Sequence, residues 1–507
     1  MWSRNNLIGK TLTVLFLIST LMFSAEAQNK FSVFNRYEMS YDHLYKLNRS
    51  IDDSLGTPWF STFKSTDENY TFNFLTSGQM LGLNISTVLG YEQFKNSNRF
   101  VVLSGETAYK SKYLNGFVSV DAYTTERRIF SEVQDIQFER FIKENAHEPI
   151  DGVFDFRFNL PTAYIETNLK YLKLSVGKMK KRWGPGYKGT LGLSGTAYSP
   201  FYYYNLNLNF GNLINMEAFL CGYDDESIYR AEMDISDTIR VKSNGINLRN
   251  FYPRYGAGQR LDLRIGKHVQ IGVYELVDFF GTNELSRFAN PLQIYYLANE
   301  SSGTNNANLL GGIDINVMVK RFRVYGEFLN DDITCFQQTG NPDKFALQLG
   351  FVFYGKDPLL QAGLEYTHVS PYVYSHSRVL SRHSHWIESM GWPWCNDQDV
   401  FTAHALFNFN ERMKGKLEVN YWLKGEGNIE SDWYTDGKPD LDNAPYWTQN
   451  PVKKLSTQIG YEYNPTNYLK LNVCYEPVIS DSKFTNGFYC YLNAKIPGTF
   501  RKNIPIK

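Results

Sequence analysis

The densest group of residues able to do chemistry is a basic segment around a Trp-Gly-Pro-Gly turn. Glycines on both sides of Pro185 bend the chain and let other groups approach the backbone. An indole face beside cations suits a sugar ring and its carboxylate or phosphate groups. A lumenal turn whose basic residues pair with inward-facing Asp and Glu explains the same pattern. The polysaccharide-binding candidates are Lys178, Lys181, Arg182, Trp183, Tyr187 and Lys188, with Gly184, Pro185 and Gly186 shaping the turn.

Acidic residues suggest a second chemistry, hydrolysis of a glycosidic bond by a pair of carboxylates. Glu275, Glu327 and the adjacent Asp331 and Asp332 are the candidates. Neighbouring residues of a strand point to opposite faces, so the two aspartates cannot both address one substrate unless they lie in a turn. Ion pairing in a polar interior explains the carboxylates more simply. We therefore expect that the protein is not an enzyme.

Metal chemistry has little support in the sequence. Four histidines lie between His368 and His385, but a His-x-His pair is common by chance in loops. Asp397 and Asp399 lack the run of oxygen ligands and the glycine of a calcium loop. We expect neither a metal nor a cofactor.

Strands must position these groups, because the apolar pattern of the chain has a period of two. Between 309 and 319 the odd positions are apolar or glycine, and Asp314 and Asn316 lie among the even positions. Such alternation places one set of side chains on each face of a strand. The same alternation recurs over 345–353, 417–423, 469–475 and 488–496.

The connections between these strands indicate a membrane barrel. Short turns such as 464–467 alternate with long polar stretches such as 425–453, as in outer-membrane barrels. Aromatic residues make up 16% of the chain although its mean hydropathy is −0.39, which fits aromatic girdles around a polar lumen. A β-propeller or β-helix would carry a repeat of fixed length, which the chain lacks. We predict an all-β, transmembrane, antiparallel up-and-down barrel of about 16 to 20 strands, with a short helix over 131–145.

The N-terminus predicts export. Arg4 and Lys10 precede the apolar run 11–23, and small residues follow up to Ala27. This is the pattern of a secretory signal peptide, and the run is too short for a spanning helix. We expect a signal peptide over 1–27 and one barrel domain over 28–507.

The charges of the chain cancel, with 52 Lys and Arg against 52 Asp and Glu. Phosphate binding needs clustered basic residues, so we expect no nucleic-acid partner. The balance also suggests compensating ion pairs in the lumen. Five cysteines are too few for a disulfide scaffold, and their odd number leaves at least one unpaired.

The segment 176–190 closely resembles the Trp-Gly-Pro-Gly region of the capsule assembly Wzi family. Three further stretches, 259–275, 290–332 and 365–372, resemble the family in the same order, and the resemblance covers 171 to about 401. Gln259 stands where a histidine is expected, and the chain ends in basic residues rather than at an aromatic one. The family motifs include Arg260, Glu275, Asp314, Glu327, Asp332 and His368.

This resemblance implies a monomeric barrel of about 18 strands in the Gram-negative outer membrane, with short periplasmic turns and longer outer loops. It implies that the barrel contacts outer-membrane lipid, binds capsular or other surface polysaccharide and helps attach or assemble capsule, without catalysis. The alternatives are an oligosaccharide diffusion channel or transporter and, from another class, a barrel hydrolase.

Overall fold

The structure is a computed structural model that describes most of residues 74–125, 157–223, 254–332, 343–431 and 451–495, with short gaps inside these ranges. The predicted signal peptide (1–27) and the predicted helix over 131–145 lie outside the described residues.

Nearly all described elements are strands, as the period of two predicts. In the first half they are β1 (Phe74–Thr76), β2 (Gln79–Gln93), β3 (Ser97–Ser111), β4 (Leu114–Thr125), β5 (Arg157–Thr167), β6 (Leu172–Met179), β7 (Phe201–Phe210), β8 (Ile214–Tyr223), β9 (Arg254–Ile265) and β10 (Val269–Phe280). In the second half they are β11 (Ala307–Val319), β12 (Phe322–Asp332), β13 (Lys344–Tyr354), β14 (Leu359–Val369), β15 (Ser384–His385), β16 (Glu388–Ser389), β17 (Gln398–Asn410), β18 (Met413–Lys424), β19 (Val452–Thr466), β20 (Leu469–Ser480) and β21 (Lys483–Lys495).

Three short helical elements accompany them: α5 (Thr282–Phe288), α6 (Tyr295–Glu300) and the 3-10 helix η2 (Val379–Ser381). Within the described residues, no helix is long and apolar enough to cross a membrane.

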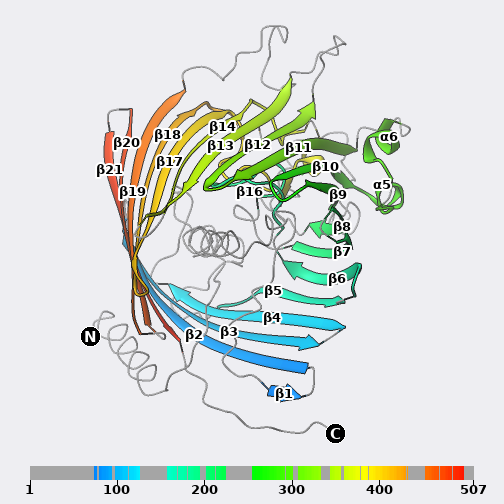
Figure 1. The fold of residues 1–507 in the computed structure, drawn as a ribbon. Helices are drawn as coiled ribbons and strands as arrows, with labels where there is room; N and C mark the ends of the chain where they lie inside the picture. The colour runs from blue at the N-terminus through cyan, green and yellow to red at the C-terminus, as the bar shows by residue number, and fades with distance from the viewer. Residues whose placement is uncertain are drawn as a thin grey trace, which may run out of the picture.

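All strands except β15 and β16, which pair only with each other, form one antiparallel sheet that closes into a ring (Figure 1). Within this sheet each strand pairs with the strands before and after it, β14 with β17 across the β15–β16 hairpin, and β2 pairs with β21 from Ser86 opposite Lys495 to Gln93 opposite Phe488, which closes the sheet. Of the 19 strands in this sheet, β1 pairs only with the first residues of β2, so 18 strands form the ring. The predicted barrel and its strand number are confirmed.

The two ends of the barrel differ in their connections. One end carries short turns such as 266–268, 320–321 and 411–412. Most connections at the other end are long, including 180–200, 281–306 and 370–397. The predicted combination of short turns at one end and longer loops at the other is therefore confirmed.

The two faces of the wall differ in polarity. On β18, Leu417 and Tyr421 are exposed on the outer face, whereas Lys416, Glu418 and Asn420 are buried on the lumenal face. Outward apolar residues and inward polar residues thus explain how a chain of negative mean hydropathy forms a membrane barrel.

Candidate functional site

Two long connections fold into the lumen and pack against its wall. Plug loop 1 (181–194) joins β6 to β7, and plug loop 2 (370–397) joins β14 to β17. They contact each other directly: the Ser194 N–H donates to the Met390 carbonyl at 2.9 Å, and the Tyr374 hydroxyl donates to the Leu191 carbonyl at 2.8 Å. Their apolar side chains share one buried cluster with lumenal residues of the wall. The two loops therefore form one packed plug.

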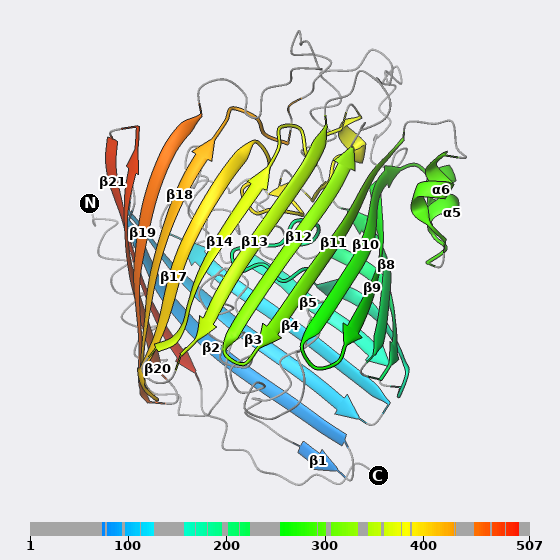
Figure 2. The ribbon, with the colours of Figure 1, turned by 45° about the horizontal axis from the view of Figure 1, so that its top comes forward.

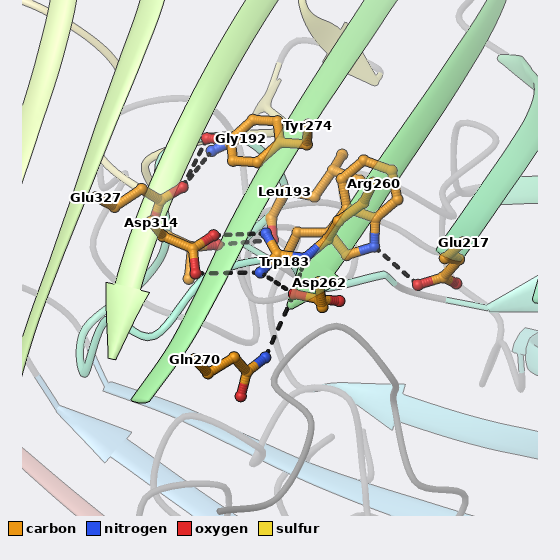
Figure 3. Close-up of polar contacts among 11 residues, drawn as sticks. Trp183, Gly192, Leu193, Glu217, Arg260, Asp262, Gln270, Tyr274, Asp314 and Glu327 are labelled. Atoms are coloured by element: carbon orange, nitrogen blue, oxygen red, sulfur yellow. Dashed lines mark hydrogen bonds and ion pairs between the residues drawn. The ribbon is translucent and has the colours of Figure 1, made fainter. Parts of the chain in front are cut away.

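Carboxylates of the barrel wall hold the backbone of this plug. Glu365 on β14 accepts the N–H groups of Tyr187 at 2.5 Å and Lys188 at 3.1 Å. Glu327 on β12 accepts the Tyr274 hydroxyl at 2.7 Å and the Gly192 N–H at 3.3 Å (Figure 3). Hydrogen bonds to a charged acceptor are stronger than neutral ones, so these carboxylates fix the position of plug loop 1.

Asp331 holds plug loop 2 in the same manner, since its carboxylate accepts the Tyr374 N–H at 2.6 Å. The plug is thus anchored to strands β12 and β14 of the wall.

Trp183 is fully buried rather than offered to solvent. Its indole N–H donates to Glu217 of β8 at 3.0 Å, and its ring packs against Phe219 and Tyr274. The Lys181 ammonium reaches the other oxygen of Glu217 at 2.8 Å. The sequence left two interpretations of the basic turn open, a sugar-binding face and a lumenal turn paired with acidic residues. Lys181 and Trp183 fit the second, because both contact Glu217 inside the barrel.

Tyr187 and Lys188 meet Glu418 of β18. The Tyr187 hydroxyl donates to the carboxylate at 3.0 Å, and the Lys188 ammonium pairs with it. The Tyr187 ring stacks on His404 at 3.7 Å between ring centroids, and the Lys188 ammonium lies 5.3 Å from the centre of the Trp394 ring. Both side chains are half-buried, so part of the surface of each remains accessible to solvent.

The remaining two basic candidates lie apart from each other. Arg182, also half-buried, donates to the Gly186 carbonyl within its own turn. Lys178 lies over the exposed Tyr202 ring, 5.6 Å from its centre, on the outer face of the wall. The structure therefore gathers five of the six predicted binding residues in the lumen and leaves Lys178 outside.

The Gly-Pro-Gly turn is shaped by close contacts. Gly184 has a φ of 114°, a backbone angle that residues other than glycine rarely adopt. A Cβ atom on Gly186 would overlap the Gln348 side chain and the Gly189 carbonyl. The Pro185 carbonyl accepts a hydrogen bond from Arg323 of β12 at 2.6 Å.

Arg260 of β9 forms a buried ion network on the lumenal face of the wall (Figure 3). Its guanidinium donates to Asp262 at 2.6 Å and to Asp314 at 2.5 Å. Gly272 lies under this group, and a Cβ atom there would overlap the guanidinium. Arg260 on β9 and Asp314 on β11, both named by the family motifs, are thus direct partners across strand β10.

The pKa values of two histidines in plug loop 2 are shifted in opposite directions. The His383 ring faces the Asp278 carboxylate at 2.6 Å and the Gly192 carbonyl at 2.8 Å. Burial lowers its pKa, but the charge of Asp278 and the hydrogen bonds to these two acceptors outweigh burial and raise it. Burial and the Lys344 charge lower the pKa of His376 to about 3.

The other predicted residues lie elsewhere. Glu275 points to the outer face of β10, opposite to the lumenal Glu327, so the structure does not bring these two carboxylates together. Asp332 ends β12, and its backbone pairs with Lys344. His368 contacts Asp399 at 2.9 Å. Among the described residues, no three His, Cys, Asp or Glu side chains gather in a metal-binding arrangement.

The sequence analysis named Glu327 and Asp331 but singled out none of three further acidic residues that hold the plug. Glu217, Glu365 and Glu418 each occupy a lumenal position in a strand with alternating polarity, and that alternation is a usable signal. Their partners in plug loop 1 are 34 to 231 positions away, so no local pattern identifies the pairs.

Comparison with known proteins places this geometry in context. The family model for capsule assembly protein Wzi matches residues 22–483. The fold is similar to the solved structure described as Wzi, an outer membrane protein involved in group 1 capsule assembly in Escherichia coli and a carbohydrate-binding β-barrel. That match has a TM-score of 0.53 at 10% identity and covers 94% of this chain and 90% of that one.

More distant structural matches include Acinetobacter baumannii OccAB4, with a TM-score of 0.45 at 10% identity over 83% of this chain and 98% of that one. Pseudomonas aeruginosa OprD also has a TM-score of 0.45 at 10% identity, over 86% of this chain and 99% of that one. No curated protein matches the chain in sequence.

Proposed function

The chain belongs to the capsule assembly Wzi family, and from this premise we propose that its barrel binds surface polysaccharide in the Gram-negative outer membrane and helps attach or assemble capsule. The observation that carries the proposal is the family match over 22–483. The two plug loops packed in the lumen support binding rather than transport, because they narrow the path that a diffusing solute would take. The proposed role involves no catalysis.

The proposed sugar contacts are the half-buried members of plug loop 1. Arg182 and Lys188 supply positive charge for anionic groups of a polysaccharide, and Tyr187 supplies an aromatic ring and a hydroxyl. Lys181 and Trp183 serve this surface indirectly, because Glu217 fixes both of them inside the wall.

Deletion of the gene tests the proposal. Cell-bound capsule should fall and polysaccharide released into the medium should rise, while the total amount synthesised stays the same. Restoring the gene should restore retention. Cell-bound capsule that is unchanged by the deletion would refute the proposal.

Two measurements on the purified protein separate the alternatives. A steady open conductance in a planar bilayer would favour a diffusion channel, whereas binding predicts a silent barrel. Release of reducing sugar that is lost in Glu327→Gln would favour a hydrolase, whereas binding predicts no such release from the wild-type protein.

We further propose that the signal peptide is removed after Ala27 and that the mature barrel is a monomer surrounded by outer-membrane lipid. The apolar outer face of the wall supports the contact with lipid. N-terminal sequencing and the mass of the detergent-solubilised particle test the first two points.

A further inference from the structure

The helices α5 and α6 lie against the outside of the barrel wall rather than above it. Figure 2 shows them on the outer side of the green strands, beside their upper part. Phe288 and Tyr295 of the helices share a buried cluster with Ala257, Val277 and Phe279, which are outward residues of β9 and β10. The helical connection therefore packs on a part of the surface that faces lipid elsewhere on the barrel.

A polar pair on the wall fixes the start of α6. Gln259 and Glu275 are direct cross-strand partners on the outer face of β9 and β10, and their side chains are joined at 2.8 Å. Glu275 accepts the Tyr295 N–H at 3.0 Å, and Gln259 donates to the Gln293 carbonyl at 2.8 Å. An uncovered carboxylate on the lipid face of a barrel is costly, and the N–H donors of Tyr295 and Gln259 compensate the charge of Glu275.

This anchoring also sets the depth of the helices. Glu275 lies near the middle of β10, and the next outward pair towards the short-turn end is Leu261 opposite Val273, each 50% exposed. Successive outward residues of a strand are about 7 Å apart. Ile294, held between the two anchored residues Gln293 and Tyr295, therefore adjoins the exposed apolar band of the strands.

The outer surface of α6 continues that band. Ile294 is 53% exposed and Leu297 is 60% exposed, and Tyr296 between them is exposed as well. We propose that α6, with Ile294 before it, is a lipid-embedded cover of the barrel wall, whose occupant is the acyl-chain region of the outer leaflet. The inference rests on the proposed outer-membrane location. The start of α6 covers the polar pair Gln259–Glu275 and presents the apolar side chains of Ile294 and Leu297 in its place.

Spin labelling in phosphatidylcholine nanodiscs tests the proposal. Single cysteines at Ile294 and Leu297 are labelled in a chain whose five native cysteines are replaced by alanine, with circular dichroism as the check on folding. Accessibility is measured for oxygen, which partitions into lipid, and for a water-soluble nickel chelate. Val273 on the strand band and Lys267 in a short turn serve as lipid and water references.

The labels at Ile294 and Leu297 should show an oxygen-to-nickel ratio several-fold above that at Lys267 and similar to that at Val273. A ratio like that of Lys267 would overturn the proposal, and shielding from both reagents would show a protein partner instead. If Val273 itself matches Lys267, the membrane location fails and the proposal fails with it. Glu275→Ala should sharpen the spectrum of the label at Ile294, because the start of α6 is released.

Discussion

Glu217 accepts the indole N–H of Trp183 at 3.0 Å, so the most conspicuous aromatic ring of the basic turn is held by strand β8 inside the barrel. The same carboxylate neutralises Lys181 at 2.8 Å. One wall residue thus satisfies the two buried polar groups that open plug loop 1. This relationship defines the loop as part of the barrel interior.

Glu217→Ala should destabilise the barrel strongly. Removing one partner of a buried ion pair leaves the other charge uncompensated and costs about 3–5 kcal/mol. The free energy of unfolding in urea, followed by tryptophan fluorescence in detergent, measures the effect. Lys173→Ala is the matched control, because its pair with Glu166 is partly exposed and is worth about 0–1 kcal/mol. Equal losses in the two variants would contradict the role of Glu217.

Glu365→Ala should loosen plug loop 1 without unfolding the wall. The N–H groups of Tyr187 and Lys188 lose a charged acceptor, a loss of about 1.5–3 kcal/mol each, which corresponds to roughly 10- to 100-fold faster amide exchange. Hydrogen exchange of a peptide over 181–194, read by mass spectrometry, measures it. Glu462→Ala, a lumenal change whose carboxylate pairs with Lys414 and Lys470 on the wall, should leave that peptide unaffected.

Gly184→Ala should destabilise the plug by about 1–3 kcal/mol, because alanine is strained at a φ of 114° and its Cβ would overlap Glu327. Gly222→Ala is the control, since a Cβ there meets no atom within 4 Å. Urea unfolding of both variants gives the comparison. A Gly184→Ala protein as stable as the control would show that the turn relaxes easily.

His383 should make the protein less stable in alkali. Its pKa is raised above 6.5, so its contribution is complete below pH 6.5 and disappears as the pH rises through the raised pKa. His383→Gln should abolish that part of the pH dependence of the free energy of unfolding. If the alkaline slopes of the variant and the wild-type protein coincide, another group is responsible.

His376 should make the protein less stable in acid, the opposite pH dependence to that of His383. Its pKa is lowered to about 3, so the unfolded chain takes up a proton near pH 6.5 that the folded chain does not. Stability should therefore fall as the pH decreases from about 6.5 towards 3. His376→Asn should be less sensitive to acid over that range, as measured by urea unfolding at a series of pH values.

The alternation of apolar and polar residues predicted the strands, and together with the short turns and long loops it predicted the barrel. In β11, Ile313 and Ile315 face outward while Asp314 and Asn316 face the lumen, because successive side chains of a strand point to opposite faces. The resemblance in the motifs supplied the strand number and the family. Gly184 and Gly186 on both sides of Pro185 also predicted a tight turn, because the backbone preferences of glycine and proline are local properties of the sequence.

Only the tertiary structure decided what the basic turn does. Lys178 and Lys181 are three positions apart in the sequence, yet one lies on the outer wall and the other pairs with Glu217 in the lumen. Glu418 meets Lys188 across 230 positions of the chain. Ring closure and the folding of the loops into the lumen bring such charges together, and these long-range contacts leave no local trace in the order of residues.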